Sequence, residues 1–129
     1  YPEKSFTGYK VAIKRDGKYY SLAMGIEYVQ GQDVIIPKTQ NGITFYKNDI
    51  LNPLKAYYSS KMIGRTAVFV TLTAAMDYYR EICTVCSQYQ HELCIVEMTL
   101  SKDLMNGVLN FTRLVVAGKH IDKIEEICV

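Results

Sequence analysis

The clearest pattern of apolar and polar positions lies in residues 64–100, which predict a strand, an amphipathic helix and a second strand in that order. After a β-branched run, apolar side chains recur at intervals of three and four residues, the spacing of one helix face. They are Leu72, Ala75, Met76, Tyr79, Ile82 and Cys83. Thr71 can accept a hydrogen bond from the free amides of the first turn. We therefore expect the main helix at about residues 71–86, with one face in the core.

Beyond this helix the pattern changes to alternation, which is typical of a strand with one buried face. One side of the strand takes Cys94, Val96, Met98 and Leu100. The other side takes Ile95, Glu97 and Thr99. The pattern therefore predicts that this second group faces away from the core.

The N-terminal pattern predicts a β-hairpin. Asp16-Gly17 separates two β-rich runs, residues 9–15 and residues 18–24. Asp-Gly is favoured in the tight turn between paired strands because both of its central residues need positive φ. The chain is therefore expected to open with two antiparallel strands.

Shorter segments follow the hairpin. Residues 26–29, 34–36 and 43–46 are apolar runs bounded by turn residues, and they predict short or edge strands. Residues 113–117 predict a further strand. Residues 47–61 give no clear pattern, so we expect a mostly irregular connection there.

Three C-terminal segments are less distinct. Residues 101–103 could cap a short helical turn, and Asn106-Gly107 is typical of another turn. Residues 120–127 space isoleucines by three, which fits either a last helical turn or an irregular strand.

Together these elements predict an α+β fold. We expect a small single domain of mostly antiparallel strands, with an N-terminal hairpin, packed against one main helix. The length of 129 residues is sufficient for one hydrophobic core. Because the chain begins with Tyr1, we expect a processed product or a domain excised from a longer protein.

The net charge, the apolar runs and the cysteine content argue against some classes of function. A net charge of +2 is too small to indicate a nucleic-acid surface, which usually shows a clustered basic face. No apolar run approaches the roughly 18 residues that suggest a membrane span. The four cysteines occur in an ordinary globular composition, so they favour reduced thiols and an intracellular protein.

One group of residues has the chemistry of metal ligands. It consists of Cys83, Cys86, His91 and Cys94. Three thiolates and an imidazole can hold tetrahedral zinc, but the interval from His91 to Cys94 is two residues where zinc knuckles have four. Cys83 and Cys94 also fall on predicted core faces. Core cysteines are therefore the preferred interpretation, and a zinc-stabilised interaction domain remains a further alternative.

No motif indicates catalysis with high specificity. The pair Cys83 and Cys86 lies at the end of the predicted helix, where the helix dipole disfavours a thiolate, which argues against redox chemistry. Neither His91 nor His120 has a flanking pattern of a catalytic triad. Glycine-rich phosphate-binding loops are absent from the sequence. We therefore predict no catalytic residue and no cofactor.

Tyrosine is unusually common, with 11 of 129 residues and pairs at positions 19–20, 57–58 and 78–79. An apolar ring with a polar tip suits stacking on a base or a hot spot for a protein partner. Outward rings beside basic side chains would form a patch for an anionic ligand or a partner protein. The candidate binding residues are Tyr20, Tyr58, Lys61, Arg65 and Arg113.

A resemblance covers roughly the C-terminal half. GRTAVFVTLTAAMDYY followed by LCIVEMTLSKDLM resembles the order of elements in poly(ADP-ribose) polymerase catalytic domains and their ADP-ribosyltransferase-like relatives. The tail LNFTRLVVAGKHIDKIEEI is similar to the closing strand of that fold. Val68 stands where the family has a tyrosine, and Thr112 or Arg113 stands about where it has the catalytic glutamate. The N-terminal run lacks the family's nicotinamide-binding histidine, with Arg15 as an arginine-type equivalent. The resemblance therefore implies a binding-only version of the fold.

Two function classes remain open. The first is a non-catalytic module that binds a nucleotide-like small molecule or a protein partner. The second is an ADP-ribosyl-transfer enzyme with displaced catalytic residues, in which Glu97, Glu125 or Glu126 replaces the missing glutamate.

Overall fold

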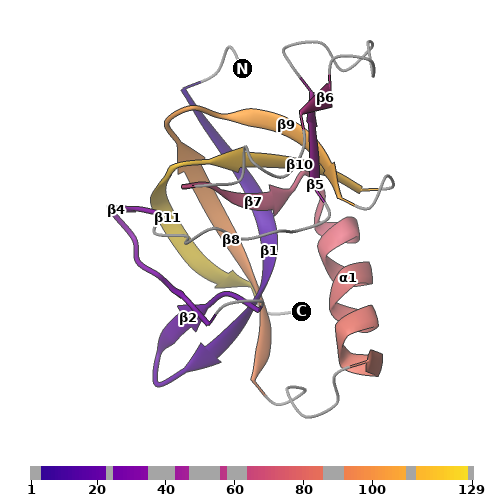
Figure 1. Ribbon diagram of the computed structural model, residues 1–129. Coiled ribbons are helices and arrows are strands. Elements are labelled where there is room, and N and C mark those ends of the chain that lie inside the picture. Colours follow the sequence, from indigo (N-terminus) through magenta and orange to yellow (C-terminus); the bar gives the residue numbers. More distant parts are fainter. Residues whose placement is uncertain are drawn as a thin grey trace.

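The computed structural model is a curved β-sheet with one α-helix against one of its faces (Figure 1). The structure describes residues 4–22, 25–34, 43–46, 56–57, 64–85, 92–109 and 113–127. The helix is α1 (Leu72–Val85). The strands are β1 (Ser5–Arg15), β2 (Lys18–Tyr20), β3 (Glu27–Tyr28), β4 (Gln32–Asp33), β5 (Ile43–Tyr46), β6 (Ala56–Tyr57), β7 (Thr66–Phe69), β8 (Leu93–Ser101), β9 (Met105–Leu109), β10 (Arg113–Gly118) and β11 (His120–Ile127).

These strands form one sheet in the order β4-β11-β8-β1-β7-β10-β9-β5-β6, and β2 and β3 extend it beside one end of β1. All of the paired strands are antiparallel. The prediction of a small, mostly antiparallel α+β domain with one packed helix is confirmed.

The predicted N-terminal hairpin is present. Arg15 pairs with Lys18, and Asp16 and Gly17 have φ values of 53° and 75°, as the tight turn requires. The first strand begins earlier than predicted, at Ser5, because it pairs with β8 along its whole N-terminal part. The second strand is shorter than predicted and ends at Tyr20.

The helix begins where the sequence indicates. The hydroxyl oxygen of Thr71 accepts a hydrogen bond from the Ala74 amide at 3.1 Å and thereby caps the first turn. All six apolar residues of the predicted stripe pack into one cluster under the helix. The end predicted at Cys86 lies outside the described residues. No helix in the described ranges has the length and apolar character needed to cross a bilayer.

Both faces of the sheet are buried. The helix-side cluster includes Val11, Ile95 and Val115, whereas the opposite face carries a second cluster that includes Val96 and Ile121. The prediction that β8 has one buried face is therefore wrong for its first half. Ile95 is only 1% exposed because α1 covers it.

The sheet curls toward the second cluster. Strands β8 and β10 are separated by β1 and β7, yet a Cβ atom on Gly118 of β10 would lie 3.0 Å from Cβ of Leu100 in β8. Side chains of non-adjacent strands therefore meet on this side. We call it the concave face.

A segment of chain crosses the concave face. It begins beside β2, on the β7 side of β1, and ends at β4, which pairs with the outer edge of β11 (Figure 1). We call residues 27–34 the strap. Tyr28 and Val34 of the strap pack into the concave-face cluster.

Several turn predictions are corrected. Residues 101–103 form no helical turn: Lys102 and Asp103 have φ values of 63° and 52° and connect β8 to β9. Asn106-Gly107 lies inside β9, because pairing with β10 overrides its turn preference. Residues 120–127, left open between two alternatives, form strand β11.

The remaining predictions of short strands agree in part with the structure. Residues 43–46 and 113–117 are strands as predicted, and residues 27–28 form a shorter strand than expected. Val34 follows β4, while residues 35–36 lie outside the described residues. Within residues 47–61, the structure describes only the short strand β6.

Gly8 offers a test of the tight approach between β1 and β7. A Cβ atom there would lie 2.5 Å from the Phe69 carbonyl oxygen and 2.5 Å from Cγ2 of Val68. We expect Gly8→Ala to lower the free energy of unfolding by about 1–3 kcal/mol, measured by urea denaturation, because the backbone oxygen cannot move freely. The control is Ser5→Ala, at an exposed position of the same strand. A Gly8→Ala protein as stable as the wild type would contradict this packing.

Candidate functional site

The structure separates the predicted basic residues. Arg65 lies just before β7, where its Nε donates to the Asp103 carbonyl at 3.0 Å, and Arg113 begins β10. Because Gly118 at the end of β10 pairs with Thr66, Arg65 and Arg113 lie at opposite ends of the β7–β10 pair. They therefore do not form one patch.

Of the other three candidate binding residues, the structure describes only Tyr20. Tyr20 is half-buried and packs toward the helix-side cluster. Tyr58 and Lys61 lie outside the described residues.

Arg113 has a structural partner. Its guanidinium forms an ion pair with Glu81 of α1 and lies 5.7 Å from the centroid of the Tyr78 ring. The hydrogen bond with Glu81 raises the pKa of Arg113, and the side chain is only 18% exposed. Arg113 therefore connects β10 to the helix and is poorly placed to receive a ligand.

The described cysteines pack as core residues. Cys83 lies against the helix-side cluster and Cys94 belongs to the concave-face cluster, so they face different sides of the sheet. Burial raises the pKa of Cys94 to about 11, which keeps the thiol protonated at neutral pH. Cys86 and His91 lie outside the described residues. Among the residues that are described, no group of three or more His, Cys, Asp and Glu side chains could hold a metal ion.

Lysines and tyrosines meet instead on the concave face. In β1, Lys10 and Lys14 lie on the same side as buried Ala12, which belongs to the concave-face cluster. Lys14 pairs in register with Tyr19 of β2, and Tyr19 pairs with Tyr28 of β3. We call these four residues, Lys10, Lys14, Tyr19 and Tyr28, the lysine-tyrosine face.

Lys10 lies between the part of β1 that pairs with β7 and the part that pairs with β2. β1 pairs with β7 at Tyr9 and then continues beside β2 from Ile13. The Lys10 ammonium reaches back to β7 and donates to the Ala67 carbonyl at 2.7 Å. It also lies 5.6 Å from the centroid of the Tyr28 ring, a cation–π distance. The half-buried ammonium is thus held by one carbonyl and one ring face.

Lys14 is paired with an acid. Its Nζ lies 2.7 Å from Oε1 of Glu126 in β11, and this contact raises the pKa of Lys14. Burial and the nearby Glu126 carboxylate raise the pKa of the Tyr19 phenol. At neutral pH the Lys14 ammonium is therefore charged, while the Tyr19 phenol is neutral and able to donate.

The other two glutamates considered for catalysis lie elsewhere. Glu97 of β8 pairs directly with Glu125 of β11 in the antiparallel ladder. Alternation along β11 places Glu125 on the side opposite to Glu126. Only Glu126 among the three therefore contributes to the lysine-tyrosine face.

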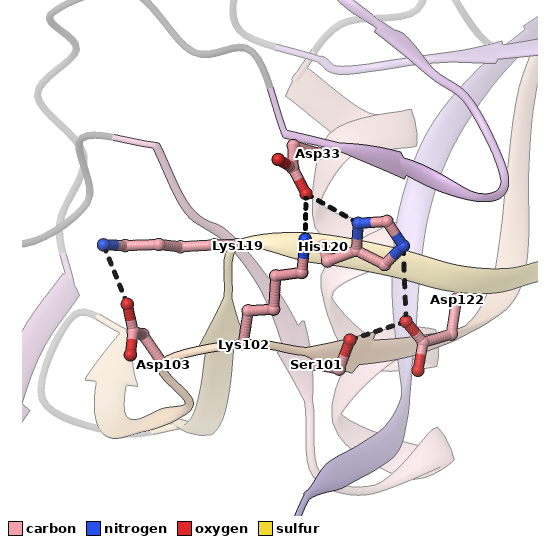
Figure 2. Close-up of polar contacts among 7 residues, drawn as sticks. All are labelled: Asp33, Ser101, Lys102, Asp103, Lys119, His120 and Asp122. Atoms are coloured by element: carbon pink, nitrogen blue, oxygen red, sulfur yellow. Dashed lines mark hydrogen bonds and ion pairs between the residues drawn. The ribbon is translucent and has the colours of Figure 1, made fainter.

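A second polar cluster holds the far end of the strap (Figure 2). Asp33 of β4 contacts Nδ1 of His120 at 2.6 Å and accepts from Nζ of Lys102 at 3.0 Å. On the other side of the imidazole, Nε2 lies 3.7 Å from Oδ1 of Asp122, which accepts from the Ser101 hydroxyl at 2.6 Å. These contacts lower the pKa of Asp33, with the His120 hydrogen bond as the largest cause.

This cluster is not a nucleophilic triad. The Ser101 hydroxyl donates to Asp122 and not to the imidazole, so the serine–histidine contact of a triad is not formed. Lys119 points away from the imidazole to Asp103 at 3.0 Å (Figure 2). The arrangement joins strands and does not activate a reacting group.

Sequence patterns did not predict either cluster. His120 has no flanking catalytic pattern in the sequence, and it is separated from Asp33 by 87 positions. The side of β1 on which Lys10 falls depends on the register with β8, which no local pattern shows. The Tyr19-Tyr20 pair was a useful signal, although Tyr19 and not Tyr20 faces the lysines.

Asp33 should make stability depend on pH. Its lowered pKa means that its contribution is present above the ordinary aspartate range and is lost as the pH falls through the folded-state value. In urea denaturation, we expect Asp33→Asn to be less stable than the wild type at about pH 7, with a difference that shrinks toward about pH 3. Asp16→Asn, in the exposed hairpin turn, is the matched control. A difference for Asp33→Asn that does not change with pH would contradict the ion pairs.

Comparisons with known proteins supply no relative for this chain. No protein-family model, curated protein or solved structure matches it. The basis for a function is therefore the geometry of the two polar clusters.

Proposed function

We propose that this chain is a non-catalytic binding module for a small, anionic, nucleotide-like ligand, and that the lysine-tyrosine face is its binding site. The observation that carries the proposal is the position of Lys10, whose ammonium is held between the Ala67 carbonyl and the Tyr28 ring.

The ammonium of Lys10 has N–H donors that can bind an anion. A lysine carries three N–H donors, and the Ala67 carbonyl takes one of them. Among the described residues, no carboxylate pairs with Lys10. A charge that is half-buried and not neutralised attracts a phosphate more strongly than one in bulk water, because the local dielectric is lower.

Tyr19 and Tyr28 supply the apolar part of the site. Their rings lie on neighbouring strands in one row with Lys14. Tyrosine rings stack on nucleobases without requiring a particular sequence of bases. A ligand with a phosphate and a flat ring therefore matches the side chains available. An intracellular location, as the cysteine content favours, would supply such ligands.

The chemistry of the site favours binding over catalysis. Cys94 is a protonated thiol at neutral pH. Glu126, the one candidate carboxylate on this face, is engaged by Lys14. The resemblance to ADP-ribosyltransferases also implies a site without its catalytic glutamate.

Thermal-shift measurements with ADP, ADP-ribose and NAD test this proposal. A ligand that binds only the folded chain raises its melting temperature in proportion to ln(1 + [L]/Kd). We expect at least one of these ligands to stabilise the wild type, and Lys10→Gln to bind it about tenfold more weakly because a charge-assisted hydrogen bond is lost. The control is Lys18→Gln, at an exposed position of β2.

Two results would overturn the proposal. Equal affinity of Lys10→Gln and the wild type would remove Lys10 from the site. The absence of a shift with every one of the ligands would favour a protein partner instead.

A second candidate function is ADP-ribosyl transfer with a displaced glutamate. The observation that favours it is that Glu126 shares a face with both lysines of the proposed site. Incubation with labelled NAD tests it: label transfer or nicotinamide release that is lost in Glu126→Gln and kept in Glu125→Gln would establish an enzyme. The non-catalytic proposal predicts neither transfer nor release.

A further inference from the structure

We infer that the strap, residues 27–34, is a lid over Lys10, Lys14 and Tyr19 of the lysine-tyrosine face, that it carries Tyr28, and that it opens from its β4 end, where a contact between Asp33 and His120 acts as a latch. The identity of the ligand beneath the lid rests on the proposed function, whereas the movement of the strap does not.

The strap blocks the site in the described conformation. Tyr28 is only 7% exposed, and its ring covers the Lys10 ammonium. A phosphate can reach the free donors of Lys10 only if this ring moves. Because the backbone of Tyr28 is held by the pairing of β3 with β2, the lifting of the strap must extend from β4 as far as β3 to move this residue.

The body of the strap is weakly held. Apart from Tyr28, Val29 and Val34, its side chains are exposed: Glu27, Gln30, Gln32 and Asp33. Its strands β3 and β4 have two residues each. Gly25 just before it and Gly31 within it have φ values of 64° and 82° and open space around them. Exposed backbone with few buried contacts opens locally at a lower free energy than the core.

Hydrogen bonds hold the strap to β11 and the residues next to it, in addition to the β4–β11 pairing. The Gly31 amide donates to the Ile121 carbonyl at 2.7 Å, and the Val34 amide donates to the Lys119 carbonyl at 2.8 Å. The Gln30 side-chain oxygen accepts from the Ile124 amide at 3.1 Å. These contacts join the strap to the outer edge of β11, and breaking them lets the strap lift from this end toward Tyr28, which is paired with Tyr19 of β2.

The latch joins residues of the sheet to one residue of the strap. Asp122 and Ser101 hold one side of the imidazole from β11 and β8, and Lys102 approaches from the turn after β8. Only Asp33 belongs to the strap. Its carboxylate is 65% exposed, and exposed ion pairs contribute little individually and are screened by salt. The latch can therefore release without unfolding the sheet.

Amide hydrogen exchange tests the movement without any ligand. We expect the Gly31 and Val34 amides to exchange faster than the amides of Ile95 and Val96 in the core. Replacing His120 by Ala should speed exchange at the strap amides about two- to fivefold and leave the β8 amides unchanged. The control is Asp77→Asn, which breaks an exposed ion pair of the helix. Exchange of the strap amides at the same rate as the core would overturn the lid.

A disulfide staple tests whether opening admits the ligand. Asp33 and His120 are register partners of an antiparallel pair, so the double variant Asp33→Cys with His120→Cys places two thiols within bonding range. Mass spectrometry under oxidising conditions verifies the bond. We expect ADP to associate at least about tenfold more slowly with the oxidised protein than with the same protein after reduction.

The possible outcomes test the lid and the proposed ligand separately. Equal ADP association rates before and after reduction would overturn the lid. If ADP binds neither form, hydrogen exchange in the stapled and unstapled protein decides the lid alone, and the proposed function fails only if ADP-ribose and NAD also fail to bind. Strap amides that the staple slows to the rate of the core would then support the lid, and unchanged exchange would overturn it.

Discussion

The pairing of β1 with β8 is the interaction on which the rest of the structure depends. Every residue from Ser5 to Ile13 has a partner in β8, although the two strands are far apart in the sequence. Both strands are covered on both faces, by α1 on one side and by the concave-face cluster on the other. β11 extends the pair beyond β8, and β7 and the hairpin extend it beyond β1. The ladder thus determines where every other element can pack.

The pairing of β1 with β8 also determines which face of the sheet carries the candidate binding residues. Alternation along β1 places Val11 and Ile13 under the helix and Lys10 on the concave face. A partly buried ammonium is unfavourable unless it is hydrogen-bonded or paired. The Ala67 carbonyl and the Tyr28 ring offset this cost in part, and an anionic ligand would offset more. The proposed binding function rests on this remaining capacity of Lys10 for an anion.

Local elements could be predicted from the sequence and tertiary ones could not. The Thr71 cap, the helix stripe and the Asp16-Gly17 turn depend on neighbouring residues, so their patterns are visible in the chain. The burial of Ile95 depends on where the helix packs against the sheet. Asn106-Gly107 becomes part of a strand only because β10 pairs with it. The contact of Asp33 with His120 joins distant elements and leaves no local signal.

We propose that Lys10 and Tyr28 on the concave face, and not the separated arginines, form the binding site. Nuclear magnetic resonance of the isotope-labelled chain during titration with ADP tests it most directly, because each side chain reports its own environment. If ADP binds at this face, we expect saturable shifts that are largest at the Lys10 side chain and the Tyr28 and Tyr19 rings. Shifts that are largest at Arg65 or Arg113, with Lys10 and Tyr28 unchanged, would contradict it.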